Sequence, residues 1–99
     1  MTTSRPSLEE IRRRSKDLFR NGYMLEVCAA IDSAGGRVNL SALVEGTGLS
    51  PSLYSGPIRR LAGLRLLLDD PKPGDDYRER WYLPADSQLW VAARQLTLS

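Results

Sequence analysis

The sequence has no histidine and only one cysteine, Cys28, among its 99 residues. Without histidine, the chain lacks the most common general base and the usual zinc ligand, and it has no Ser-His or Cys-His nucleophile pair. A single cysteine allows neither an internal disulfide nor a cysteine-based metal cluster. We therefore expect that the protein is not an enzyme, that it has no catalytic residues, and that it holds no metal and no cofactor.

Long apolar runs are also missing. No run approaches the roughly 20 residues of a transmembrane helix, and the N-terminus lacks a signal-peptide pattern. Apolar residues make up 41% of the chain, which favours a globular core over disorder. We expect a flexible tail over residues 1–6, a single domain over residues 7–99, no membrane association and a cytoplasmic location.

Neither sign of charge dominates, because 14 Lys and Arg stand against 12 Asp and Glu, for a net charge of +2. So small an excess is weak evidence for nucleic-acid binding. The distribution is more informative: residues 1–20 hold six basic and three acidic residues, whereas residues 69–80 hold three basic and five acidic. The basic run RRRSK at 12–16 is interpreted as a solvated helix face, with an additional phosphate contact as the alternative.

Helix signals fill the first third of the chain. Ser7 and Glu10 form a capping box, S-x-x-E, before an amphipathic pattern that Asn21-Gly22 ends. A second helix is predicted over residues 23–33 and is stopped by Gly35-Gly36.

A longer helix is predicted in the middle of the chain. Ser50 is its expected cap, Pro51 suits its first position, and the pattern continues to about Leu64. Pro57 lies inside this segment and has no N–H to donate, so it predicts either a kink or a later start near Ser55.

Short segments around that helix have strand character. Residues 64–70 and 77–83 flank a tip rich in turn formers and predict a β-hairpin. Residues 37–40 predict a third strand that pairs with the hairpin, and Ser41 is the expected cap of a short helix that follows. After Pro84, a last helix is expected over residues 86–96.

Two helices joined by a tight glycine-containing turn and followed by a hairpin form the layout of a winged helix-turn-helix. The segment LSPSLYSGPIRRLAGLRLL (49–67) resembles the turn and recognition helix of winged-helix bacterial transcription regulators of the PadR, MarR and ArsR kind. The segment RERWYLPADSQLWVAARQL (78–96) is similar to the end of their wing and their closing helix. The likeness covers residues 40–96.

The resemblance implies a fold and a function. The implied fold is α+β, mainly α: a winged helix-turn-helix with a small three-stranded antiparallel sheet and flanking N- and C-terminal helices. The implied function is that of a dimeric regulator, here expected to be a repressor, which inserts its recognition helix into the major groove of double-stranded DNA.

The chain departs from the family pattern in two ways. Such regulators usually have glycine just after the recognition helix, where this chain has Arg65, and this predicts a shifted helix end. Metal sensors of the ArsR kind carry clusters of cysteine or histidine ligands, which this chain lacks, so metal sensing is not expected.

Candidate DNA contacts follow from the position of the recognition helix. Arg59 is the candidate for reading a base, because a guanidinium pairs bidentately with guanine, and Arg60 is the candidate for a phosphate. Serines at the start of the helix are candidates for phosphate contacts, and basic residues of the wing for the backbone or minor groove. The complete set is Ser50, Ser52, Tyr54, Ser55, Arg59, Arg60, Lys72, Arg78 and Arg80.

Alternatives remain for several of these residues. The alternative for Arg59 and Arg60 is that they are solvated side chains whose stems cover the core. Tyr54 shares a helical face with Ile58 and Leu61, and that face is expected to pack inward. The aspartates near the wing tip would repel phosphate, so the wing is either partly solvated or acts through its return-strand arginines.

Subunit contacts are expected from the first and last helices. Leu8, Ile11 and Leu18 on one, with Trp90 and Leu96 on the other, either form a homodimer seam or close the core of a monomer. Cys28 is interpreted as a buried small hydrophobe, with redox sensing as the alternative. The alternative to DNA binding is a winged-helix module for protein–protein interaction. No residue indicates an effector.

Overall fold

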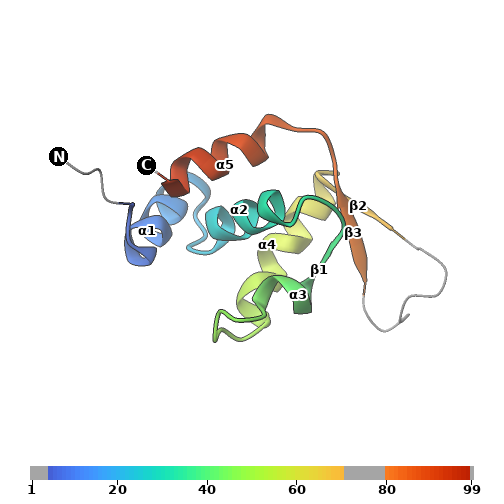
Figure 1. The fold of residues 1–99 in the computed structure, drawn as a ribbon, viewed down its shortest axis with the longest axis horizontal. Helices are drawn as coiled ribbons and strands as arrows, with labels where there is room; N and C mark the ends of the chain where they lie inside the picture. Colours follow the sequence, from blue (N-terminus) through green and yellow to red (C-terminus); the bar gives the residue numbers. More distant parts are fainter. Residues whose placement is uncertain (1–4, 71–79, 99) are drawn as a thin grey trace.

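The computed structural model describes residues 5–70 and 80–98, which form five helices and three strands (Figure 1). The predicted class, mainly helical with a small sheet, is confirmed. No helix in this described part is long and apolar enough to cross a membrane. The order is α1 (Leu8–Phe19), α2 (Met24–Ala34), β1 (Val38–Asn39), α3 (Leu40–Val44), α4 (Ser52–Gly63), β2 (Leu67–Asp69), β3 (Trp81–Pro84) and α5 (Gln88–Leu98).

The start of α1 is the predicted one. The Ser7 hydroxyl accepts a hydrogen bond from the backbone N–H of Glu10 at 3.1 Å, which satisfies one of the free donors of the first turn. The carboxylate of Glu10, the expected partner in the capping box, lies 3.3 Å from the guanidinium of Arg14, one turn further along the helix.

The end of α1 comes earlier than predicted. The helix stops at Phe19, and Arg20, rather than Asn21-Gly22, adopts the left-handed conformation with φ 57°. Asn21 is engaged elsewhere, because its side-chain oxygen accepts from the N–H of Tyr23 at 2.8 Å. The buried hydroxyl of Ser15 donates to the Asn21 carbonyl at 2.6 Å, which fixes the turn against α1.

The short helix α3 has a different cap from the one predicted. Asn39, not Ser41, is its N-cap, and the Asn39 side-chain oxygen accepts from the N–H of Ala42 at 2.7 Å. The expectation for Ser41 is wrong because Asn39 leaves β1 with extended backbone, which places its amide over the first turn.

The helix α4 runs unbroken through Pro57, so the expected later start near Ser55 is wrong. The expected cap is also wrong by one position: Pro51, not Ser50, is the N-cap, it is in helical conformation, and no side-chain hydrogen bond caps the helix. The Ser50 hydroxyl instead accepts from the N–H of Ser52 at 3.4 Å. The residue before a proline avoids helical conformation because its Cβ crowds the proline ring. Here that residue is Gly56, which has no Cβ.

The end of α4 is not shifted. Arg65 itself takes the left-handed conformation, with φ 61°, at the position where glycine is usual. The N–H of Leu66 donates to the carbonyl of Leu61 at 2.9 Å, and the N–H of Arg65 donates to the carbonyl of Ala62 at 3.1 Å. These two bonds form a Schellman motif around a residue with a side chain.

The sheet has the strand order β1-β3-β2 and is antiparallel throughout. Val38 lies opposite Tyr82, and Leu68 lies opposite Leu83. The prediction of a hairpin with a third short strand is therefore confirmed for the described residues. The tip of the hairpin lies outside them.

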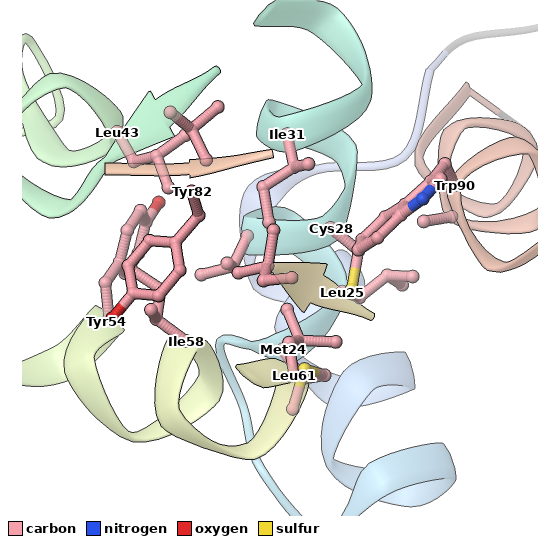
Figure 2. Close-up of a cluster of buried hydrophobic side chains, with 14 residues drawn as sticks. Met24, Leu25, Cys28, Ile31, Leu43, Tyr54, Ile58, Leu61, Tyr82 and Trp90 are labelled. Atoms are coloured by element: carbon pink, nitrogen blue, oxygen red, sulfur yellow. The ribbon is translucent and has the colours of Figure 1, made fainter. Parts of the chain in front are cut away.

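The core is built around α2, which lies between α5 on one side and α4 on the other (Figure 1). Leu25, Cys28 and Ile31 of α2 are fully buried. Figure 2 shows Trp90 of α5 on one side of this helix and Tyr54 of α4 with Tyr82 of β3 on the other. α4 is thus fixed on the core by one face, and Ser52 and Arg59 on its opposite face are exposed.

The placement of Trp90 corrects one part of the expected dimer seam. Its side chain is 7% exposed and its ring N–H donates to the carbonyl of Ala85 at 2.7 Å. Because the indole ring is buried and its N–H is bonded within the chain, Trp90 closes the monomer core and is not available to contact a second subunit.

Candidate nucleic-acid interface

The two sides of α4 differ in what they contact. Tyr54, Ile58 and Leu61 are all less than 5% exposed, so the face predicted to pack inward does so. Ser52 and Arg59 are exposed, and the 100° spacing of helical residues places them on the opposite side. We call this side, made of Ser52, Ser55, Gly56, Arg59 and Gly63, the outer face of α4.

A charged network holds the inner side of α4 against α1 and α2. The carboxylate of Glu26 accepts from the Arg12 guanidinium at 2.7 Å and from the Tyr54 hydroxyl at 2.6 Å. Burial, followed by this hydrogen bond to Glu26, raises the pKa of Tyr54. The guanidinium of Arg12 also lies 4.9 Å from the ring centroid of Tyr23, a cation–π contact.

Tyr54 is therefore a correction to the candidate list. The Tyr54 side chain is 2% exposed and its hydroxyl is bound to Glu26, so it is not placed to contact DNA. Its role in this structure is to set the orientation of α4.

The adjacent arginines of α4 have different surroundings. Arg60 extends toward α1, where its guanidinium donates to the carbonyl of Phe19 at 3.3 Å. Arg59 is exposed, and within residues 5–70 and 80–98 it forms no hydrogen bond or ion pair. The structure thus leaves Arg59 available, whereas Arg60 already contacts the C-terminal end of another helix, where a cation is favourable.

The three candidate serines lie together at the first turn of α4. The hydroxyls of Ser50 and Ser52 are 2.9 Å apart, and the Ser55 hydroxyl donates to the Ser52 carbonyl at 3.0 Å. Ser50 and Ser52 are exposed, and Ser55 is half-buried. Their expected phosphate contacts stay predictions.

Among the wing candidates, Arg80 is the one that the structure describes, since Lys72 and Arg78 lie outside the described residues. Arg80 is exposed, and its guanidinium lies 3.8 Å from the carboxylate of Asp69, which is also exposed. A hydrogen bond with the Tyr82 side chain, followed by the charge of Asp69, raises the pKa of Arg80. The guanidinium therefore stays charged at the foot of the hairpin.

The fold brings Arg59 and Arg80 to the same groove, which has a volume of about 300 Å³. The groove lies between α4, β3 and the junction of β1 with α3. Its lining comprises Asn39, Leu40, Ser41, Ser55, Ile58, Arg59, Arg80 and Tyr82. Asn39, Leu40 and Ser41 were not among the predicted site residues, because only the pairing of β1 with β3 places them beside α4.

The basic run of α1 is largely used within the chain. Arg12 binds Glu26, and the Arg14 guanidinium donates to the carbonyl of Leu96 at 2.9 Å. Arg13 remains 71% exposed at its side chain, 3.5 Å from Glu10. The interpretation of this run as a solvated face therefore holds for Arg13, whereas Arg12 and Arg14 tie α1 to α2 and α5.

The described residues give little support for a metal site or for a reactive cysteine. Within them, no group of three His, Cys, Asp or Glu side chains gathers to hold a metal ion. Burial raises the pKa of the Cys28 thiol to about 12, so it stays protonated and shielded. This favours the interpretation of Cys28 as a buried hydrophobe.

Comparisons with known protein families, with curated proteins and with solved structures find no match to this chain. The functional argument therefore depends on the geometry of α4, the hairpin and the groove between them.

Proposed function

We propose that this chain is a cytoplasmic, homodimeric transcription regulator with a winged helix-turn-helix fold. It acts as a repressor by placing the outer face of α4 in the major groove of a promoter. The arrangement supports this: α3 and α4 are joined by residues 45–51, and the β2–β3 hairpin follows with β1 as the third strand. In such a fold the second helix of the pair enters the groove.

The observation that carries the proposal is the state of Arg59. Its side chain projects from the outer face of a helix whose inner face is anchored by buried residues, and it has no partner among the described residues. A guanidinium that uses none of its five donors on the described residues, and that projects from a rigid helix, is suited to bidentate contact with guanine.

The small side chains around Arg59 support the same proposal. Ser52, Ser55, Gly56 and Gly63 share the outer face, and a Cβ added at either glycine would meet no atom within 4 Å. The major groove is about 12 Å wide and admits one α-helix, so a helix with small outward residues can approach the bases closely.

A homodimer through α1 and α5 is part of the proposal. The bond from Arg14 to the Leu96 carbonyl places the end of α5 beside α1, as Figure 1 also shows. Leu18 is 58% exposed on α1, and Leu96 is 37% exposed on α5. Light scattering coupled to gel filtration tests this: we expect a dimer for the native chain and a monomer for Leu18→Glu, whereas a native monomer would contradict it.

A protein-interaction module is the second candidate, and one observation favours it. Leu68 and Leu83 lie opposite each other across β2 and β3, and they are 44% and 43% exposed. Exposed apolar side chains that lie together on a sheet are a feature of protein–protein contact surfaces. If this candidate is correct, the protein does not prefer any DNA sequence, and Leu83→Ser removes binding of its protein partner.

Selection from a pool of random-sequence duplexes tests the DNA-binding proposal directly. We expect enrichment of a two-fold symmetric motif, because a symmetric dimer presents two copies of α4. Fluorescence anisotropy with the enriched duplex should show affinity that falls steeply with salt and exceeds that for a scrambled duplex. Failure to enrich any motif, with equal affinity for both duplexes, would contradict the proposal.

A further inference from the structure

We propose that Arg37 is a positioning residue for the expected DNA contact of Arg80. Its guanidinium holds Trp81 and Asp70 in place, and this sets where Arg80 stands beside the outer face of α4. We call Asp69, Asp70, Arg80 and Trp81 the foot of the hairpin. The consequence for DNA binding depends on the proposed function, whereas the hold on Trp81 does not.

The Arg37 side chain connects the ends of three strands. Arg37 directly precedes β1, and its Nε atom lies 3.0 Å from the carboxylate of Asp70, which directly follows β2. Its guanidinium carbon lies 4.1 Å from the ring centroid of Trp81, the first residue of β3. Because β3 lies between β1 and β2 in the sheet, this side chain crosses the central strand.

The crossing lies on the side of the sheet that points away from the core. The Tyr82 side chain is 7% exposed and lies in the core (Figure 2). Because neighbouring residues of a strand point to opposite faces, Trp81 points away from the core. A planar guanidinium over an aromatic ring is a favourable cation–π arrangement, so Arg37 covers Trp81 on this side.

The foot of the hairpin has two ion pairs, and the one with Arg37 is the more shielded. The side chains of Arg37 and Asp70 are 25% and 19% exposed and lie 3.0 Å apart. Those of Arg80 and Asp69 are 73% and 68% exposed and lie 3.8 Å apart. Exposed pairs contribute little and are screened by salt, whereas partly buried pairs are screened less. The Arg37 pair is therefore the one suited to fix the foot.

The backbone pairing of the sheet is short. β1 has two residues, β2 has three and β3 has four. A two-stranded hairpin is only marginally stable by itself, so contacts that join it to β1 matter. The Asp70 N–H donates to the Trp81 carbonyl at 2.9 Å. Arg37 contacts the side chains of these same two residues and so reinforces this backbone pair from β1.

The position of Arg80 depends on Trp81. Arg80 directly precedes Trp81, and the alternation of side chains puts it on the same face as Tyr82, which forms a hydrogen bond with it. There it lines the groove that Arg59 of α4 also lines. Its ion pair with Asp69 is too exposed to fix it. We therefore expect that releasing Trp81 spreads Arg80 over many positions and weakens its contact with DNA phosphate.

Hydrogen exchange of the protein alone tests the hold on the foot. In Arg37→Gln we expect the Asp70 amide to exchange about tenfold faster, while the amides of α2 exchange as in the native chain. Arg37→Lys keeps the charge but not the planar group, so its rate should lie between the two. An unchanged Asp70 amide, or a uniform rise that includes α2, would overturn the positioning role.

A double-mutant cycle on the selected duplex tests whether Arg37 acts through Arg80. Arg80→Gln should weaken binding about tenfold, and Arg37→Gln should weaken it to a similar extent. The double variant should bind no more than about twofold weaker than Arg80→Gln alone, because the contact is already lost. Losses that multiply would mean that Arg37 acts independently of Arg80, and this would contradict the proposal.

The matched control for the lost charge is Arg94→Gln. Arg94 forms a comparable ion pair with Asp32 at 3.5 Å, but between α5 and α2, away from the hairpin. Its affinity for the selected duplex should stay within about twofold of the native value. A loss as large as that of Arg37→Gln would mean that net charge alone explains the effect, and this would overturn the positioning role.

The outcomes for this role and for the proposed function are distinguishable. If Arg59→Ala loses its base preference while Arg37→Gln and Arg80→Gln bind like the native protein, the positioning role is wrong and the regulator stands. If the native protein shows no sequence preference, the regulator is wrong, and the role of Arg37 in DNA binding is wrong with it. Slower exchange of the Asp70 amide in the native chain than in Arg37→Gln would then still show the hold on the foot.

Discussion

Arginines in two regions of this molecule have opposite surroundings. At the junction of α1, α2 and α4, the Arg12 guanidinium is bound to Glu26 and lies over the ring of Tyr23. On the outer face of α4, Arg59 has no such partner among the described residues. Both regions contain adjacent arginines in the sequence, so the presence of arginines alone does not indicate which side chains are available to a partner. That depends on which guanidinium groups the fold pairs within the described residues.

The junction is the place where a single change should have the largest effect. Glu26→Ala removes the acceptor for both Arg12 and Tyr54, so we expect the free energy of unfolding to fall by about 2 kcal/mol. The control, Asp32→Ala, breaks the longer ion pair of 3.5 Å with Arg94, whose side chain is 55% exposed, and should cost less than about 0.5 kcal/mol. Urea denaturation measures both. Equal losses would mean that the junction is no stronger than a surface ion pair.

Tyr54→Phe tests whether the contacts at the junction can be weakened without changing DNA binding by the outer face of α4. Loss of the hydroxyl should lower the free energy of unfolding by about 1 kcal/mol, because the bond to Glu26 is lost. The dissociation constant for the selected duplex should not change, since the side chain is buried. Anisotropy and urea denaturation on the same preparation check both. Weaker DNA binding with unchanged stability would return Tyr54 to the interface.

Arg65→Gly probes the C-terminal end of α4. Arg65 is in the left-handed conformation, which is unfavourable for a residue with a Cβ, so glycine should raise the free energy of unfolding by about 0.5–1 kcal/mol. Thermal denaturation measures the gain. Arg20→Gly, at the left-handed end of α1, should give a similar gain. A lower free energy of unfolding in both variants would mean that the arginine side chains stabilise the helix ends by more than their left-handed backbone conformation costs.

Local signals in the sequence predicted much of the fold. The Ser7 cap, the stop at Gly35 and the hairpin each depend on residues a few positions apart, and all three are present. The cap of α3 was missed because Asn39 is set in place by the pairing of β1 with β3, two segments distant in the chain.

The candidate site was predicted in part. Helical spacing placed Arg59 opposite the buried face of α4, as the structure has it. The same spacing cannot tell that Arg60 reaches the carbonyl of Phe19, or that Arg80 and Asn39 line one groove with Arg59. Contacts between elements distant in sequence depend on tertiary packing, which periodicity does not encode.

The most direct measurement is the affinity of Arg59→Ala for the selected duplex, beside Arg13→Ala, which removes the same charge from the exposed face of α1. Each is measured by fluorescence anisotropy at three salt concentrations. We predict that Arg59→Ala loses about 1–3 kcal/mol of binding free energy and its preference at one base pair, whereas Arg13→Ala stays close to the native protein. Equal losses in the two variants, or none in Arg59→Ala, would contradict the assignment of the outer face of α4 as the DNA-reading surface.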